Sequence, residues 1–104
     1  MPKRPDRLAA EVLECWLEEH PSWRLEGGHL VRELRTTDYR GAVTLLEAQV
    51  ELAEAMDHHP VASVGYRELR LELWTHDRRA ITQLDIDYAE GFEALLERFD
   101  DLLS

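Results

Sequence analysis

One segment of this chain alternates almost strictly between apolar and polar residues, and it limits the possible folds more than any other. It runs from Arg67 to Thr75, and period-two alternation of this kind is typical of a β-strand that buries a single face. Its apolar face carries Leu69, Leu71 and Leu73. We therefore expect helices to cover that face, with Trp74 and His76 on the side away from the leucines.

Three further segments have the composition of strands. Ser22 to Glu26 and His29 to Arg35 flank Gly27-Gly28, and glycines accept the positive φ angles of a tight hairpin turn. Val61 to Val64 is a short apolar run that ends at Gly65. The sequence thus predicts an early hairpin and a short strand before the alternating segment.

Helical spacing of apolar residues appears in three places. The first helix is expected from an N-cap at Asp6 to about His20, and the second from Tyr39 to Asp57. The third is expected to begin at the capping-box spacing of Thr82 to Asp85 and to reach Leu103. The stripe of the second helix that we expect to face the sheet consists of Ala42, Val43, Leu46, Val50 and Ala53.

This order of elements predicts an α+β fold, in which a four-stranded antiparallel sheet has three helices packed on one face (α-β-β-α-β-β-α). With 104 residues and 44% hydrophobic content, the chain can bury one modest core and not two. We expect a single domain over residues 1–104.

Charge and cysteine content narrow the function classes. The formal net charge is −10, which repels phosphate backbones and anionic lipid, so we expect no nucleic-acid partner and no membrane partner. The single Cys15 excludes an intramolecular disulfide, and no apolar run approaches the ~20 residues of a membrane span. A cytoplasmic location is expected, since no signal-peptide pattern is present.

Two neighbouring histidines, His58 and His59, stand where the second helix is expected to stop. Pro60 lacks an N–H and biases the preceding residue away from the α region. Histidine exchanges protons near neutrality, so a third imidazole nearby would make an acid–base site. Alone, the pair is more typical of a solvated helix end.

These residues carry a resemblance to a known family. Glu54, His58-His59-Pro60, Tyr66, Leu73-Trp74-Thr75-His76 and Asp85 resemble the signature of the pterin-4a-carbinolamine dehydratase (4a-hydroxytetrahydrobiopterin dehydratase) family. The similarity extends over most of the chain and is far more specific than an isolated pair of histidines. It favours a site over a solvated helix end.

Two departures from the family pattern concern the walls of the site. Ala62 stands where members commonly carry an aromatic residue, and Asp77-Arg78-Arg79-Ala80 replaces small, glycine-rich residues. The histidines themselves are retained, so the departures bear on substrate detail and assembly more than on the chemistry.

The resemblance implies a lyase that dehydrates 4a-hydroxytetrahydropterin to quinonoid dihydropterin, in the recycling of tetrahydrobiopterin. It implies no metal and no organic cofactor, a hydroxylated pterin as substrate, and an aromatic amino acid hydroxylase as a candidate partner in the same pathway. The reaction needs an acid near the leaving oxygen on C4a and a base near N5.

By the same resemblance, His58 and His76 are the acid/base pair, and His59 binds and orients the pterin. Glu54, one turn before His58, would hydrogen-bond the His58 imidazole or a ring N–H, since residues i and i+4 share a helix face. Asp85 would cap the third helix, orient His76, or do both.

Two tryptophans are candidates for the substrate site, and each has a structural alternative. Trp74 would form a pocket wall or a subunit contact, and Trp23 would stack near the pterin or pack in the core. His20 and His29 have no partners at useful spacing, and we assign them no role.

Two other functions compete with catalysis by histidine. A zinc site would need three or four converging ligands, whereas adjacent histidines point apart, so we expect no metal. A non-catalytic interaction scaffold or assembly factor of the same fold is the second alternative, and the retained histidines speak against it.

A homodimer or homotetramer is expected, because an open sheet has two edges and the second helix carries further apolar residues beside its stripe. These are Leu45, Leu52 and Met56. Within each subunit we expect the site in an open cleft between the end of the second helix and the loop after Thr75.

Overall fold

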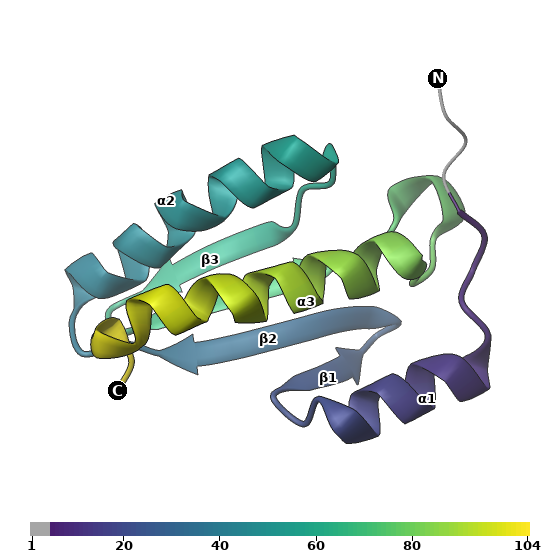
Figure 1. The fold of residues 1–104 in the computed structure, drawn as a ribbon, viewed down its shortest axis with the longest axis horizontal. Coiled ribbons are helices and arrows are strands. Elements are labelled where there is room, and N and C mark those ends of the chain that lie inside the picture. Colours follow the sequence, from purple (N-terminus) through teal and green to yellow (C-terminus); the bar gives the residue numbers. More distant parts are fainter. Residues whose placement is uncertain (1–4) are drawn as a thin grey trace.

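The computed structural model describes residues 5–104, and its elements follow the predicted α+β order (Figure 1). The helices are α1 (Ala10–Glu19), α2 (Tyr39–Met56) and α3 (Gln83–Leu96). The strands are β1 (Trp23–Glu26), β2 (His29–Arg35), β3 (Val61–Gly65) and β4 (Glu68–Leu73). Two short 3-10 helices, η1 (His76–Arg78) and η2 (Glu97–Leu102), follow β4 and α3. The four strands form one antiparallel sheet in the order β1-β2-β4-β3, which leaves β1 and β3 as edges.

The leucines of β4 face the helices, as their spacing predicts. Leu69 and Leu71 are fully buried, and Leu73 pairs across the sheet with Leu30 of β2. Side chains from all three helices complete this layer, among them Trp16, Leu45 and Phe92. The core therefore lies between one face of the sheet and the helices, and the other face stays open.

The buried stripe of α2 is rotated from the predicted one. Leu45 is fully buried, whereas Val50 is 46% exposed. The cause is Gln49, a buried polar residue whose side-chain oxygen accepts a hydrogen bond from the Tyr88 hydroxyl. A stripe drawn through apolar residues alone misses it. The residues of α2 that are buried are Gly41, Ala42, Leu45, Gln49 and Ala53.

The predicted N-cap at Asp6 is wrong, because α1 begins only at Ala10. The preceding residues lie extended beside the segment that leads into α3, where the Leu8 amide donates to the Ile81 carbonyl at 2.9 Å and Arg7 pairs with Thr82. These contacts satisfy backbone groups that a longer helix would have used.

The third helix has the predicted capping box, with Thr82 at the N-cap, but its α-helical part ends at Leu96 and not at Leu103. The chain continues as η2, whose Phe99 has non-helical angles. The helix stops because the C-terminal residues turn back to the end of β2, where the amide of Ser104 donates to the Arg35 carbonyl at 3.1 Å. None of the helices in residues 5–104 is long and apolar enough to cross a membrane.

Candidate active site

The end of α2 is shaped by a residue that precedes both histidines. Asp57 adopts the left-handed conformation, with φ of 50° and ψ of 45°. Its amide donates to the Glu54 carbonyl at 3.2 Å, and the His58 amide donates to the Ala53 carbonyl at 3.0 Å. This pair of bonds is a Schellman motif, which ends a helix by itself. Pro60 is therefore not the direct cause of the helix end, and the reversal at Asp57 turns His58 inward.

His58 is held in the interior by Asp85 of α3. The side chain of His58 is only 7% exposed and that of Asp85 is fully buried. Nε2 of His58 donates to Oδ1 of Asp85 at 2.6 Å. This contact joins the end of α2 to the start of α3, which the sequence places 27 residues apart.

The second oxygen of Asp85 is also engaged. Oδ2 accepts hydrogen bonds from the Thr75 hydroxyl and from the Thr82 amide, both at 2.9 Å. The Thr82 hydroxyl donates in turn to the Thr75 oxygen at 2.7 Å. Asp85 thus caps α3, as expected, but the histidine that it contacts is His58 and not His76.

A carboxylate accepts only, so the neutral His58 ring must carry its proton on Nε2. The other nitrogen, Nδ1, then has a free lone pair. Within residues 5–104, every buried side-chain nitrogen or oxygen has a hydrogen-bond partner. Since only Nε2 of His58 is engaged, by Asp85, Nδ1 is not fully buried. Nδ1 is therefore the atom of His58 that can exchange a proton with a molecule outside the core.

The three histidines border one hollow of about 280 Å³. Its lining comes from the end of α2 and from the start of η1: Asp57, His58, His59, Thr75, His76 and Asp77. His58 forms its buried side, whereas His59 and His76 are exposed. The structure thus brings together His58, His59 and His76 in a partly open cleft between the α2 terminus and the loop after β4.

Glu54 contacts the second histidine of the pair and not the first. Nε2 of His59 donates to the Glu54 carboxylate at 2.8 Å, and both side chains are more than half exposed. Because Asp57 turns His58 inward, His58 leaves the helix face on which Glu54 lies.

His76 sits at the start of η1, and its ring stacks on Trp74 with centroids 4.4 Å apart. It therefore lies on the Trp74 side of the sheet, as predicted, although β4 itself ends at Leu73. Trp74 is half-buried beside the hollow without lining it.

Trp23 lies elsewhere, on the helix-covered face of the sheet. It is 3% exposed, it meets Phe92 edge to face at 6.4 Å, and its indole N–H donates to Glu93 at 3.1 Å. The structure does not bring Trp23 to the hollow, which favours the packing alternative.

Sequence reasoning gave no role to Thr75, although a signal for it exists. Thr75 continues the series of Leu69, Leu71 and Leu73, and that parity predicts an inward side chain. It is 2% exposed and donates to Asp85. A polar residue at an inward position requires a buried partner.

The described residues offer no preformed metal site. Within residues 5–104, no group of three or more His, Cys, Asp or Glu side chains is arranged to hold a metal ion. Nε2 of His58 is engaged by Asp85 and Nε2 of His59 by Glu54.

Comparisons of the sequence with known proteins all point to one family. Residues 6–95 match the family described as Pterin 4 alpha carbinolamine dehydratase. A protein of Natronomonas pharaonis is 38% identical over 92 residues, which is 88% of this chain and 98% of that one. One of Acidobacterium capsulatum is 33% identical over 90 residues, or 86% of this chain and 98% of that one. Both carry the name pterin-4-alpha-carbinolamine dehydratase as a provisional assignment.

Solved structures with a similar fold point to the same family. The transcriptional coactivator/pterin dehydratase of Brucella melitensis superposes with a TM-score of 0.80 at 25% identity, over 86% of this chain and 98% of that one. A pterin dehydratase-like protein identified as a RuBisCO assembly factor shares the fold, with a TM-score of 0.61 at 22% identity, over 71% of this chain and 88% of that one. By sequence and by fold, this chain belongs to the pterin-4a-carbinolamine dehydratase family.

Proposed function

We propose that this protein is a lyase that dehydrates 4a-hydroxytetrahydropterin to quinonoid dihydropterin by histidine acid/base catalysis. The observation that carries the proposal is the shared hollow, to which two separate segments bring His58, His59 and His76. Membership of the family supports the pterin as substrate. The proposed setting is tetrahydrobiopterin recycling in the cytoplasm, beside an aromatic amino acid hydroxylase.

The reaction needs one base and one acid, and the two halves of the hollow suit these roles differently. His58 is the base, and its Nδ1 takes the proton from N5. The electron pair of that N–H bond forms the N5–C4a double bond, and the C4a–O bond breaks with its electrons on oxygen. His76 is the acid, which protonates the departing hydroxide so that it leaves as water.

The Asp85 carboxylate makes His58 suited to accept a proton. An imidazole whose far nitrogen donates to a buried carboxylate keeps one tautomer, and the imidazolium that forms is stabilised by the negative charge. Asp85 is fully buried and donors occupy both of its oxygens. Its position is therefore fixed before substrate arrives.

His59 and Glu54 are proposed to bind the pterin rather than to transfer protons. Their hydrogen bond lies at the exposed rim of the hollow. An exposed ion pair is easily rearranged, so either partner can turn to a polar edge of the pterin ring.

The direct test is an assay of dehydration with freshly generated 4a-hydroxytetrahydropterin, run beside elemental analysis of the same preparation. Turnover well above the spontaneous rate, without stoichiometric metal, is the expected result. A rate equal to the spontaneous one would refute the proposal. Turnover that scales with bound metal would replace the histidine pair with metal chemistry.

The alternative is a non-catalytic scaffold or assembly factor. It gains weight from the fold-level neighbour identified as a RuBisCO assembly factor. A scaffold has no need of a base oriented by a buried carboxylate, and the His58–Asp85 contact therefore supports the enzyme.

We also propose that the protein forms a homodimer or a homotetramer. Leu45 belongs to the core, so it offers no surface to a partner, but other apolar surface is available. Val61 on the β3 edge is 48% exposed, and a groove of about 670 Å³ runs between α2 and the C-terminal helices. Its lining is Ala48, Glu51, Leu52, Ala55, Gly91, Ala94, Leu95, Arg98 and Phe99. Light scattering at micromolar concentration should give a mass at least twice that of the chain.

A further inference from the structure

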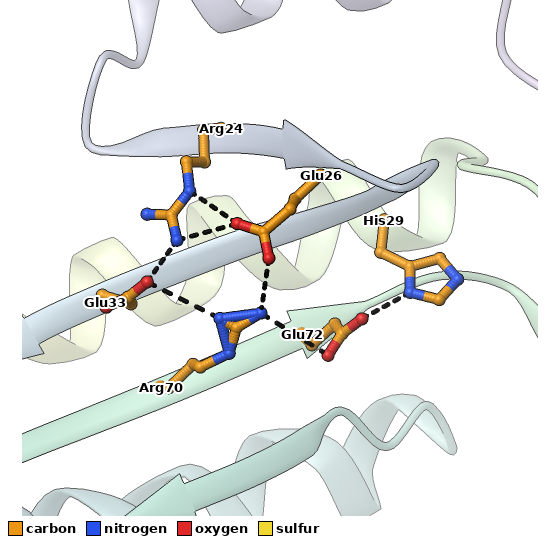
Figure 2. Close-up of polar contacts among 6 residues, drawn as sticks. All are labelled: Arg24, Glu26, His29, Glu33, Arg70 and Glu72. Atoms are coloured by element: carbon orange, nitrogen blue, oxygen red, sulfur yellow. Dashed lines mark hydrogen bonds and ion pairs between the residues drawn. The ribbon is translucent and has the colours of Figure 1, made fainter.

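The open face of the sheet carries an ordered polar network (Figure 2). Arg70 of β4 lies between Glu26 of β1, at 3.1 Å, and Glu33 of β2, at 3.6 Å. Arg24 hydrogen-bonds Glu33, and this bond lowers the pKa of the Glu33 carboxyl group. Val31, whose cross-strand partners are Arg24 and Glu72, is fully buried. The side chains of the network are partly exposed but paired with one another.

His29 lies at the end of this network that is nearest the hollow. Its Nδ1 donates to the Glu72 carboxylate at 2.5 Å, as Figure 2 shows. Glu72 in turn faces Arg70 at 3.8 Å. The orientation of the His29 ring is thus set by a strand neighbour that is itself held.

His29 also stacks on Trp74, with ring centroids 3.8 Å apart and planes inclined by 6°. The register explains this contact: Leu30 pairs with Leu73, so the preceding residue of β2 lies opposite the residue that follows β4. On its other side the indole meets His76, at 4.4 Å and 27°. Two imidazoles this close to one indole centroid would overlap if they shared a face, so the indole lies between them.

His76 depends on this stack for its orientation. Its side chain is exposed, and within residues 5–104 no hydrogen bond holds its ring. The ring that we assign as the proton donor is therefore stacked on the indole, which packs against the core and is stacked on its other side by His29.

We propose that His29 is a positioning residue for His76, acting through Trp74. Glu72 fixes His29, His29 fixes the plane of the indole, and the indole holds His76 at the rim of the hollow. The expected effect on kcat rests on the proposed function, whereas the expected effect on the orientation of the His76 ring does not. It also assigns Trp74 a role other than substrate stacking, because both faces of the indole are covered.

The test compares His29→Ala, which removes the ring, with His29→Phe, which keeps an aromatic face and loses the bond to Glu72. The matched control is His20→Ala, since His20 stacks on Trp16 at 4.1 Å and 15° far from the hollow. The first readout is the NMR resonance of the His76 ring protons, identified by their loss in His76→Gln. These protons lie over the indole and are shifted by its ring current.

We expect His29→Ala to move and broaden the His76 resonances and His20→Ala to leave them in place. His29→Phe should restore them in large part, because it keeps the aromatic face but not the bond to Glu72. In the dehydration assay, His29→Ala should lower kcat about three- to tenfold, the range that one ring–ring contact spans, with KM nearly unchanged. His29→Phe should recover most of the loss. Unchanged His76 resonances in His29→Ala, or equal effects of Ala and Phe, would overturn the proposal.

The two readouts separate this inference from the proposed function. Shifted His76 resonances in a protein without dehydratase activity would sink the function and leave the positioning role intact. An active protein in which His29→Ala changes neither the resonances nor kcat would sink the positioning role alone.

Discussion

The two histidines proposed as the acid/base pair are held in opposite ways. His58 is buried, and a hydrogen bond of 2.6 Å fixes it to the fully buried Asp85. His76 is exposed on a short 3-10 turn, where a stack on Trp74 orients it. One half of the site is thus a buried polar cluster, and the other is an aromatic stack on the open face of the sheet.

The difference shows what each half can do. A buried imidazole with one nitrogen committed keeps a single tautomer and presents a single nitrogen, which suits a base. An exposed imidazole keeps both nitrogens open to water, so solvent can restore its proton after each turnover. Burial also ties the first half to the stability of the fold, whereas the second half is nearly independent of it.

The largest expected effect comes from Asp85→Asn. An asparagine oxygen can still accept from Thr75 and Thr82, but its amide would face Nε2 of His58 and impose the other tautomer. We expect kcat to fall about 10²- to 10⁴-fold while the protein stays folded. The matched control is Asp38→Asn, the same change at the N-cap of α2, where the side chain accepts from Gly41. Equal losses in both variants would mean that capping alone explains the effect.

The comparison also predicts a contrast in stability. His58→Ala leaves a buried carboxylate oxygen without its donor, which costs about 1–3 kcal/mol. His76→Ala removes an exposed ring and its stack on Trp74, and should lower the free energy of unfolding by about 0.5–1 kcal/mol, the lower part of the range for a ring–ring contact because the ring is exposed. Urea denaturation followed by circular dichroism measures both. If both variants lost a similar free energy of unfolding, the two halves of the site would not differ in how they are tied to the fold.

A smaller effect is expected at the exposed rim. Glu54→Gln weakens the contact with His59, and an exposed pair of this kind is worth at most about 1 kcal/mol. We expect KM to rise no more than about fivefold, with kcat unchanged. Steady-state kinetics decide this, and a large loss of kcat would move Glu54 into the proton-transfer step.

The smallest effect concerns the loop after His76. Arg79 adopts the left-handed conformation, with φ of 49°, which disfavours residues with a Cβ. Arg79→Gly should raise the free energy of unfolding by about 0.5 kcal/mol, since the gain is offset in part by the flexibility of glycine in the unfolded chain. Asp57 is the other non-glycine residue with positive φ within residues 5–104, and Asp57→Gly should gain less, because Asp tolerates this region better. Thermal denaturation of both variants tests the order.

Local patterns in the sequence predicted most of the fold. The alternation from Arg67 to Thr75 and the glycine pair after Glu26 define β4 and the hairpin, because one face of a strand must be buried. The α2 stripe was misplaced at Gln49, whose burial depends on a tyrosine of α3. A polar residue satisfied by a distant partner leaves no local signal.

The sequence predicted which histidines form the site, but not which hydrogen bonds they make. Spacing and resemblance placed His58, His59 and His76 together. They did not show that Asp85 would bind His58 rather than His76, or that Glu54 would bind His59. Both choices depend on Asp57, whose left-handed conformation reverses the chain one residue before His58. The left-handed backbone conformation of one non-glycine residue, Asp57, cannot be predicted from the sequence pattern.

The central claim is that the two halves work as one acid/base unit, and a double-mutant cycle tests it most directly. Single-turnover rates of dehydration would be measured for the wild type, His58→Ala, His76→Ala and the double variant. Residues that act as a unit are strongly non-additive, so each single variant should lose about 10²-fold or more and the double variant little beyond the deeper single. Losses that multiply, or a His76→Ala variant that keeps the wild-type rate, would contradict the account.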